Sequence, residues 1–248
     1  MFSIDHFIWI GISLFFAGIL LFFSRKFKFS FKTATYVILG IYLISEISKI
    51  FYQVLPTADG NGFYFNPSYL PLQMCSITLF FVIYLAFSKN VKGIEFVKSF
   101  VIEMMLIAAP VALLFGTCFN SENTAHAFDS FKDFEVYQFF LYHSGMVWYG
   151  LYLVTTKQVK MGFKPWWQSL IVITILLLTS VWINGILSVY HTNFMFTVTP
   201  PVNGIPLINL KHGYAPFLIH YLIAIAFITL LFQLPSIIKQ QRNKKVSK

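Results

Sequence analysis

The sequence predicts an all-α protein that crosses a membrane several times. Hydrophobic residues make up 57% of its 248 residues and charged residues 11%, with a mean hydropathy of +0.71, whereas soluble domains are about half apolar and a quarter charged. The apolar residues form continuous runs of about 20, which favours membrane helices over the alternating strands of a β-barrel. These features exclude an ordinary soluble domain and a disordered chain.

Seven apolar runs are long enough, or nearly so, for a helix across the hydrocarbon core. The segment before the first run holds no Lys or Arg, and Arg25 and Lys26 follow the run directly, so we expect a retained helix and not a signal peptide. Basic residues follow the third and fifth runs, and turn-forming residues follow the second and sixth. In one domain, 1–248, we predict spans at 7–23, 33–55, 70–87, 99–119, 138–156, 167–189 and 214–234, then a basic tail at 235–248.

Positive charge is concentrated in alternate connections. Fifteen of the eighteen Lys and Arg residues lie on one side of the predicted bundle, after the first, third, fifth and seventh runs. The positive-inside rule therefore places the N-terminus outside and the C-terminus in the cytoplasm. The net charge of +9 is thus a signal of topology and of contact with lipid headgroups. We expect membrane lipids as partners, and neither nucleic acid nor a soluble protein.

Polar residues of the apolar runs gather toward the predicted outer side. Glu46 and Lys49 lie one helical turn apart, and Asn184 lies in the outer half of the sixth run. Residues of this kind inside a membrane cost free energy and usually face the bundle interior. If the protein has an active site, we expect it in this outer half. The other polar residues on the outer side, or in the outer part of a run, are Cys75, Cys118, His6, His126, His143, His191, His212 and His220.

These residue types can support acyl transfer. Cys75 is a nucleophile once it is a thiolate, and an outer-half histidine can take its proton. Asn184, Gln73 or a backbone N–H can stabilise the oxyanion that forms. The sequence shows that these groups share one membrane depth, and it leaves their contacts open.

Structural interpretations of the same residues stay open. Each histidine can be a hydrogen-bonding group between helices, and Glu46 and Lys49 can neutralise each other. Cys75 can be a small buried residue or can form a disulfide with Cys118. A zinc site assembled from several helices is a further alternative, but no two histidines lie four residues apart. We therefore expect no metal or other cofactor.

Four segments, in this order, resemble a known family. They are the start Phe2-Ser3-Ile4-Asp5-His6-Phe7, then Leu70-Pro71-Leu72-Gln73-Met74-Cys75-Ser76, then Tyr142-His143-Ser144-Gly145, then Asn184 with Asn193-Phe194-Met195-Phe196 and Pro200-Pro201. The chain resembles the YwaF-like family of bacterial integral membrane proteins, which is similar to eukaryotic transmembrane protein 164. Gln73 stands where that family usually has His. Tyr214-Ala215-Pro216-Phe217 stands where it has Pro-Trp-Pro-Tyr.

The resemblance implies a Cys-dependent acyltransferase of the bacterial cytoplasmic membrane. It implies that Cys75 carries the acyl group as a thioester during phospholipid remodelling. Because the candidate residues lie near the predicted outer headgroup level, we expect the substrates to be phospholipid or lipoprotein acyl chains at the outer leaflet. His143 is the first candidate for the base, because its segment is the next best match. The supporting or substrate-binding candidates are His6, Glu46, Lys49, Gln73, Asn184, Asn193 and His220.

Two other function classes remain. A small-solute transporter, or the substrate-binding subunit of one, would use breaks in the helices, and Pro110, Gly116, Gly145 and Gly185 lie near or within the runs. A metal-dependent membrane lipid hydrolase would use the histidines as ligands.

Overall fold

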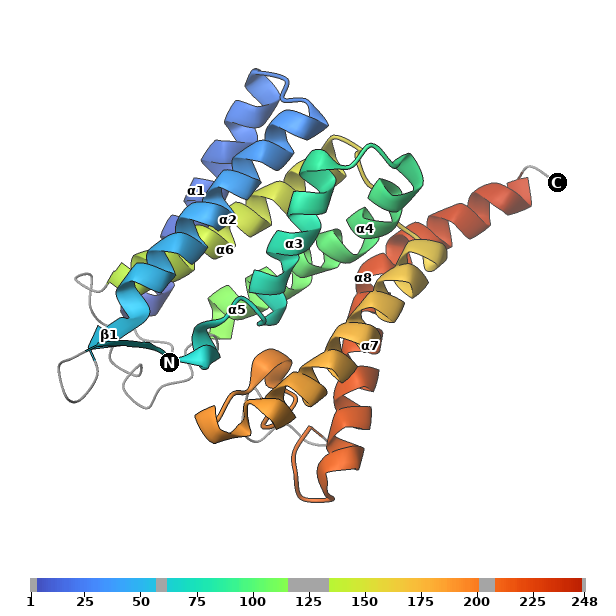
Figure 1. Ribbon diagram of the computed structural model, residues 1–248. Helices are drawn as coiled ribbons and strands as arrows, with labels where there is room; N and C mark the ends of the chain where they lie inside the picture. The colour runs from blue at the N-terminus through green and yellow to red at the C-terminus, as the bar shows by residue number, and fades with distance from the viewer. Residues whose placement is uncertain (1–3, 57–61, 116–133, 201–207, 247–248) are drawn as a thin grey trace.

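The computed structural model describes residues 4–56, 62–115, 134–200 and 208–246. Long helices lie side by side in one bundle, with α1, α2 and α6 grouped on one side and α7 and α8 on the other (Figure 1). The helices are α1 Ile4–Lys26, α2 Phe31–Gln53, α3 Met74–Phe87, α4 Val91–Glu103, α5 Ala109–Phe115, α6 Phe134–Thr155, α7 Phe163–Ile186 and α8 Tyr214–Val246. A π-helical turn, η2 Met104–Ala108, joins α4 and α5 into one rod.

Among the described residues, five helices are long and apolar enough to cross a membrane. They are His6–Lys26, Phe31–Phe51, Val91–Phe115, Phe163–Ile186 and Tyr214–Asn243. The predicted runs at 70–87 and 138–156 correspond to α3 and α6. Helix α3 has 14 residues, which is short for a span, and α6 carries Gln138, His143 and Ser144 among its apolar residues. The chain is a multi-pass, all-helical membrane protein, and the count of seven spans stays a prediction.

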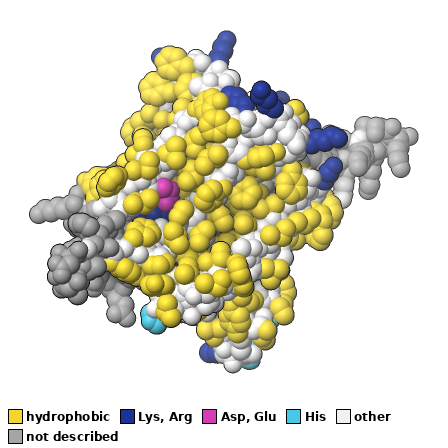
Figure 2. Space-filling view, in the orientation of Figure 1, with side chains coloured by type: hydrophobic (Ala, Val, Ile, Leu, Met, Phe, Trp, Pro, Cys, Tyr) yellow, Lys and Arg dark blue, Asp and Glu magenta, His cyan; other side chains and the backbone are white. Residues whose placement is uncertain are grey.

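Helix α6 forms the centre of the bundle. Its Trp148, Tyr149 and Tyr152 are fully buried, and it packs against α1, α2 and η2. Gly150 allows the close approach of η2, because a Cβ there would lie 2.8 Å from the Cβ of Met105. The outer faces of α1, α2, α7 and α8 expose large apolar side chains, and hydrophobic side chains cover the middle of the face in Figure 2. Such a surface is suited to lipid.

The connections after α1, α3 and α6 lie at the same end of the bundle as the C-terminal end of α8 (Figure 1). We call this the basic end, because Lys and Arg side chains gather there in Figure 2. Two of its lysines also hold the bundle together. Lys32 Nζ donates to the carbonyl oxygens of Leu85 and Ala86, at 2.9 and 2.7 Å, and so caps α3. Lys98 is buried; its Nζ lies 2.8 Å from Glu95 Oε1 on the same helix and 4.4 Å from the centroid of the Phe31 ring of α2.

The elements differ from the predicted boundaries at three places. The second helix ends at Gln53, because strand β1 Val54–Pro56 follows it and pairs antiparallel with β2 Phe63–Phe65. The predicted tail at 235–248 is mostly helical, since α8 continues through Pro235 to Val246. The helical rod predicted at 99–119 begins at Val91. The fold class is all-α apart from this short hairpin.

Candidate functional site

Cys75 lies in a buried cluster of polar side chains at the end of the bundle opposite the basic end. The cluster comprises Tyr42 and Glu46 of α2, Cys75 and Ser76 of α3, and Tyr142 of α6, and we call it the thiol cluster. The Tyr42 and Tyr142 rings meet edge to face with centroids 4.9 Å apart. The Tyr42 hydroxyl donates to the Cys75 carbonyl oxygen at 3.4 Å. All five residues are at most 9% exposed.

The position of Cys75 follows from the start of α3. Gln73 is the N-cap residue, with extended backbone angles, so Cys75 is the second residue of the helix. The first N–H groups of a helix have no acceptor within it, and they give its N-terminus a partial positive charge. This charge favours the thiolate form of a cysteine and any negative charge that develops beside it.

The Tyr142 hydroxyl is the least satisfied polar group of the thiol cluster. It lies within electrostatic range of Cys75 and Glu46, and it approaches the side chains of Tyr42 and Ser76. It makes no hydrogen bond of standard geometry with any residue that the structure describes. Buried hydroxyl groups are normally hydrogen-bonded, so a donor without a partner needs an explanation.

His143 follows Tyr142 on α6 and is 3% exposed. Its Nδ1 lies 2.8 Å from the carbonyl oxygen of Phe139, and its ring contacts those of Phe139 and Tyr142. A carbonyl accepts only, so Nδ1 carries a proton, and in the uncharged tautomer of the ring the lone pair is on Nε2. The structure thus brings His143 beside the thiol cluster, and its contact with Cys75 stays a prediction.

Two other histidines were candidates for the base. His6 is buried, and its Nε2 lies 2.9 Å from the carbonyl oxygen of Leu113, which ties α1 to α5. This contact favours the structural interpretation of His6, because the proton on Nε2 is committed to that carbonyl. His220 is half-buried on the second turn of α8.

Glu46 and Lys49 form an ion pair at the border of the thiol cluster. Lys49 Nζ lies 2.5 Å from Glu46 Oε2, and the two side chains are 17% and 10% exposed, respectively. The interpretation in which these residues neutralise each other therefore describes the observed pair. Because Glu46 also faces the two tyrosines, the lysine offsets a negative charge beside Cys75.

Gln73 joins α3 to the segment that follows α7. Its Nε2 donates to the Asn193 carbonyl oxygen at 3.2 Å, and its Oε1 accepts from the Met195 N–H at 3.0 Å. The segment 188–199, which we call the amide loop, contains left-handed residues at His191, Met195 and Phe196. The amide of Gln73 is thus engaged with the backbone of the amide loop.

Two more predicted residues stabilise the amide loop from within. Asn184 Nδ2 donates to the Phe194 carbonyl oxygen, and its Oδ1 accepts from the Phe194 N–H. Asn193 Oδ1 accepts from the Val198 N–H at 3.0 Å. Asn184 Nδ2 donates to both the Phe194 carbonyl oxygen and Thr197 Oγ1, whereas Gln73 Nε2 donates one of its two N–H groups to the loop. Their roles toward an oxyanion stay predictions. Both residues position the loop beside the start of α3.

The segment before α3 is hydrogen-bonded to the amide loop and lies within electrostatic range of Glu135 on α6. It contains the 3₁₀ turn η1, Pro67–Tyr69, whose N-cap Asn66 accepts from the Ser68 N–H. Burial raises the pKa of the Tyr69 hydroxyl, and the Glu135 carboxylate raises it further. The Ser68 hydroxyl donates to the Tyr190 carbonyl oxygen at 3.4 Å.

A second buried polar cluster was missed by the sequence analysis. We call it the glutamate cluster: Glu103 of α4, Ser169 of α7, Gln233 of α8 and Gly162. Glu103 is fully buried; its Oε2 accepts from the Ser169 hydroxyl at 2.5 Å and its Oε1 from Gln233 Nε2 at 3.1 Å. Gln233 Oε1 in turn accepts from the Gly162 N–H. A charged residue inside an apolar run was the signal that could have found it.

The described residues bear on whether the histidines and cysteines hold a metal ion. Among the described residues, no group of three or more His, Cys, Asp or Glu side chains could hold a metal ion. Cys118 and His126 lie outside the described residues, so the disulfide and zinc interpretations stay open.

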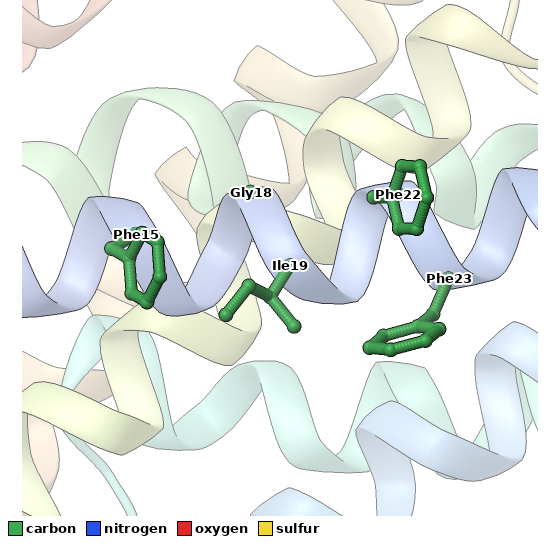
Figure 3. A pocket seen from close by; sticks show the side chains of 5 residues that line it. All are labelled: Phe15, Gly18, Ile19, Phe22 and Phe23. Carbon is green, nitrogen blue, oxygen red and sulfur yellow. The ribbon is translucent and has the colours of Figure 1, made fainter.

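An apolar groove on α1, lined by Phe15, Gly18, Ile19, Phe22 and Phe23, offers no polar side chain for chemistry (Figure 3).

Comparison with known proteins identifies the family. The model of the TMEM164 family matches residues 1–234, which include the thiol cluster, the amide loop and most of α8. No curated protein and no solved structure matches the chain. Because the family match covers nearly the whole sequence, the chain belongs to the TMEM164 family.

Proposed function

We propose that this protein is a membrane acyltransferase that carries an acyl group on Cys75. The observation that carries the proposal is the burial of Cys75 at the N-terminus of α3, in one cluster with Tyr42 and Tyr142. His143 follows Tyr142 in the chain. The family match supports it, because the resemblance to transmembrane protein 164 implies this activity. The chemistry needs a nucleophile, a base and a stabilised oxyanion.

The reaction has two steps that balance. In the first, His143 Nε2 takes the Cys75 proton, and the sulfur forms a bond to the carbonyl carbon of a lipid ester. The ester C–O bond breaks, and the lysolipid alcohol leaves with the proton from His143. In the second, an acceptor hydroxyl or amine loses its proton to His143 and attacks the thioester, the C–S bond breaks, and the Cys75 sulfur takes the proton back from His143. Splitting one transfer into two steps lowers each barrier.

The topology fits substrates in the outer leaflet. We propose seven spans, with the N-terminus outside and the basic end in the cytoplasm of a bacterium. The thiol cluster then lies near the outer headgroups, where the ester bonds of outer-leaflet phospholipids are found. The proposed substrates are therefore phospholipid or lipoprotein acyl chains.

The test uses the purified full-length protein in phosphatidylcholine vesicles with a radiolabelled acyl chain. We expect label on the protein that neutral hydroxylamine releases, as it does a thioester, and label on an added lysolipid acceptor. Cys75→Ala should lose both signals, and Cys75→Ser should lose the hydroxylamine-sensitive one. Cys118→Ala is the matched control and should keep both. A Cys75→Ala protein that still transfers the acyl chain would overturn the proposal.

A further inference from the structure

The thiol cluster contains one donor that the proposed reaction has not used. The Tyr142 hydroxyl is buried, lies within electrostatic range of the Cys75 thiol, and has no hydrogen bond of standard geometry among the described residues. Leaving such a group without a partner costs about 1–3 kcal/mol. This free energy is recovered when a substrate brings a hydrogen-bond acceptor to the hydroxyl.

Several other donors of the candidate site already make hydrogen bonds. The Tyr42 hydroxyl donates to the Cys75 carbonyl oxygen, and the amide groups of Gln73 and Asn184 bind the backbone of the amide loop. His143 Nδ1 is engaged with the Phe139 carbonyl oxygen. The Tyr142 O–H, which makes no hydrogen bond of standard geometry among the described residues, can therefore meet a new acceptor from the substrate.

We propose that Tyr142 is a catalytic residue whose hydroxyl donates a hydrogen bond to the oxyanion formed on Cys75; this assignment rests on the proposed function. When the sulfur adds to the ester carbonyl carbon, the C=O electron pair moves onto oxygen, and the Tyr142 O–H stabilises that charge. When the intermediate collapses, the pair re-forms C=O and the alcohol leaves with the proton held by His143. Tyr142 keeps its own proton throughout.

The charges around Tyr142 are arranged for this role. The Glu46 carboxylate lies within electrostatic range of the hydroxyl and would oppose a nearby oxyanion. Its ion pair with Lys49 offsets that charge. A fixed donor in a site without water stabilises an oxyanion more strongly than a donor in solution, because it needs no reorganisation.

Tyr142→Phe tests the assignment, and Tyr149→Phe on the same helix is its matched control. Tyr149 is also fully buried, but its hydroxyl lies 2.8 Å from Thr35 Oγ1. For Tyr142→Phe we expect kcat to fall about a hundredfold to a thousandfold with KM unchanged, since the oxyanion exists only after attack. Its melting temperature should stay the same or rise, because no hydrogen bond is lost. Tyr149→Phe should melt lower and keep its kcat.

Acyl transfer is measured in the same phosphatidylcholine vesicles, with kcat expressed per folded protein. A Tyr142→Phe kcat within twofold of the unmodified protein, with Cys75→Ala inactive, would overturn the role of Tyr142 and leave the proposed function standing. A kcat loss in Tyr149→Phe equal to that in Tyr142→Phe would also overturn it, since packing would then explain both. An active Cys75→Ala protein would instead remove the proposed function itself.

Discussion

The thiol cluster and the glutamate cluster are both buried and polar, and both join three helices. In the glutamate cluster each oxygen of Glu103 accepts a hydrogen bond, and the acceptor of Gln233 is used by Gly162. In the thiol cluster the Tyr142 hydroxyl lacks such a bond among the described residues, and it lies next to a nucleophile. The glutamate cluster is therefore satisfied without a ligand, whereas the thiol cluster has a donor that can bind one.

This difference distinguishes buried polar groups that stabilise the packing of helices from buried polar groups that can bind a substrate. A satisfied network mainly fixes how helices pack, because its groups gain nothing from a new partner. A donor left without a bond costs free energy until a substrate meets it. The comparison therefore predicts that substitutions in the thiol cluster change rates, whereas substitutions in the glutamate cluster change stability.

The largest effect is expected for His143→Asn. The asparagine amide can keep the hydrogen bond to the Phe139 carbonyl oxygen that Nδ1 makes, but it removes the basic Nε2. Loss of a general base lowers rates by about a hundredfold to ten-thousandfold. Acyl transfer in vesicles, corrected for folded protein by size-exclusion chromatography, measures this. If His6→Gln abolishes transfer and His143→Asn does not, the base has been assigned to the wrong helix.

Glu103→Ala should have the largest effect on stability. It leaves the donors of Ser169 and Gln233 without an acceptor between α4, α7 and α8, which should lower the free energy of unfolding by about 3 kcal/mol. Glu103→Gln, which keeps one acceptor and the shape, should cost less. Thermal unfolding in detergent compares the two. Were Glu103→Gln folded but inactive, the glutamate cluster would be functional and the contrast between the clusters would fail.

Gln73→Ala should have a moderate effect that reaches the thiol cluster indirectly. It removes two hydrogen bonds between the start of α3 and the amide loop, which should cost about 1–2 kcal/mol. Hydrogen exchange followed by mass spectrometry should show faster exchange across 188–199, with acyl transfer reduced less than in Tyr142→Phe. Unchanged exchange in this segment would mean that Gln73 does not hold the loop.

The smallest effect is expected for the ion pair of Glu46 and Lys49. The pair is largely buried, with 10% and 17% of the side chains accessible, so the desolvation of the two charges offsets most of their attraction and the net contribution of the pair is small. A double-mutant cycle with Glu46→Gln and Lys49→Met measures the coupling by thermal unfolding. If Lys49 offsets a charge beside Cys75, Lys49→Met alone should slow acyl transfer, and adding Glu46→Gln should restore it.

The positions of the helices could be predicted because hydropathy is a local property. The runs at 7–23 and 167–189 each correspond to one helix in the structure. The sequence could also place Cys75 and His143 at one membrane depth. It could not show the role of Gln73, because its two partners lie about 120 residues away in the chain. Tyr142 was overlooked because a tyrosine in an apolar run is usually a packing residue.

The π-helical turn η2 also fixes the rotational phase of α5. One residue corresponds to about 100° around an α-helix, so the wider turn at Met104–Ala108 makes the helical faces before and after it differ by roughly that angle. Leu113 follows the turn and receives the hydrogen bond from His6, while Met105 within it packs against Gly150. A regular α-helix of the same residues would turn Leu113 away from α1, whereas deleting one residue together with the π turn would keep Leu113 in place. The register of this rod is therefore set by an irregularity of the helix.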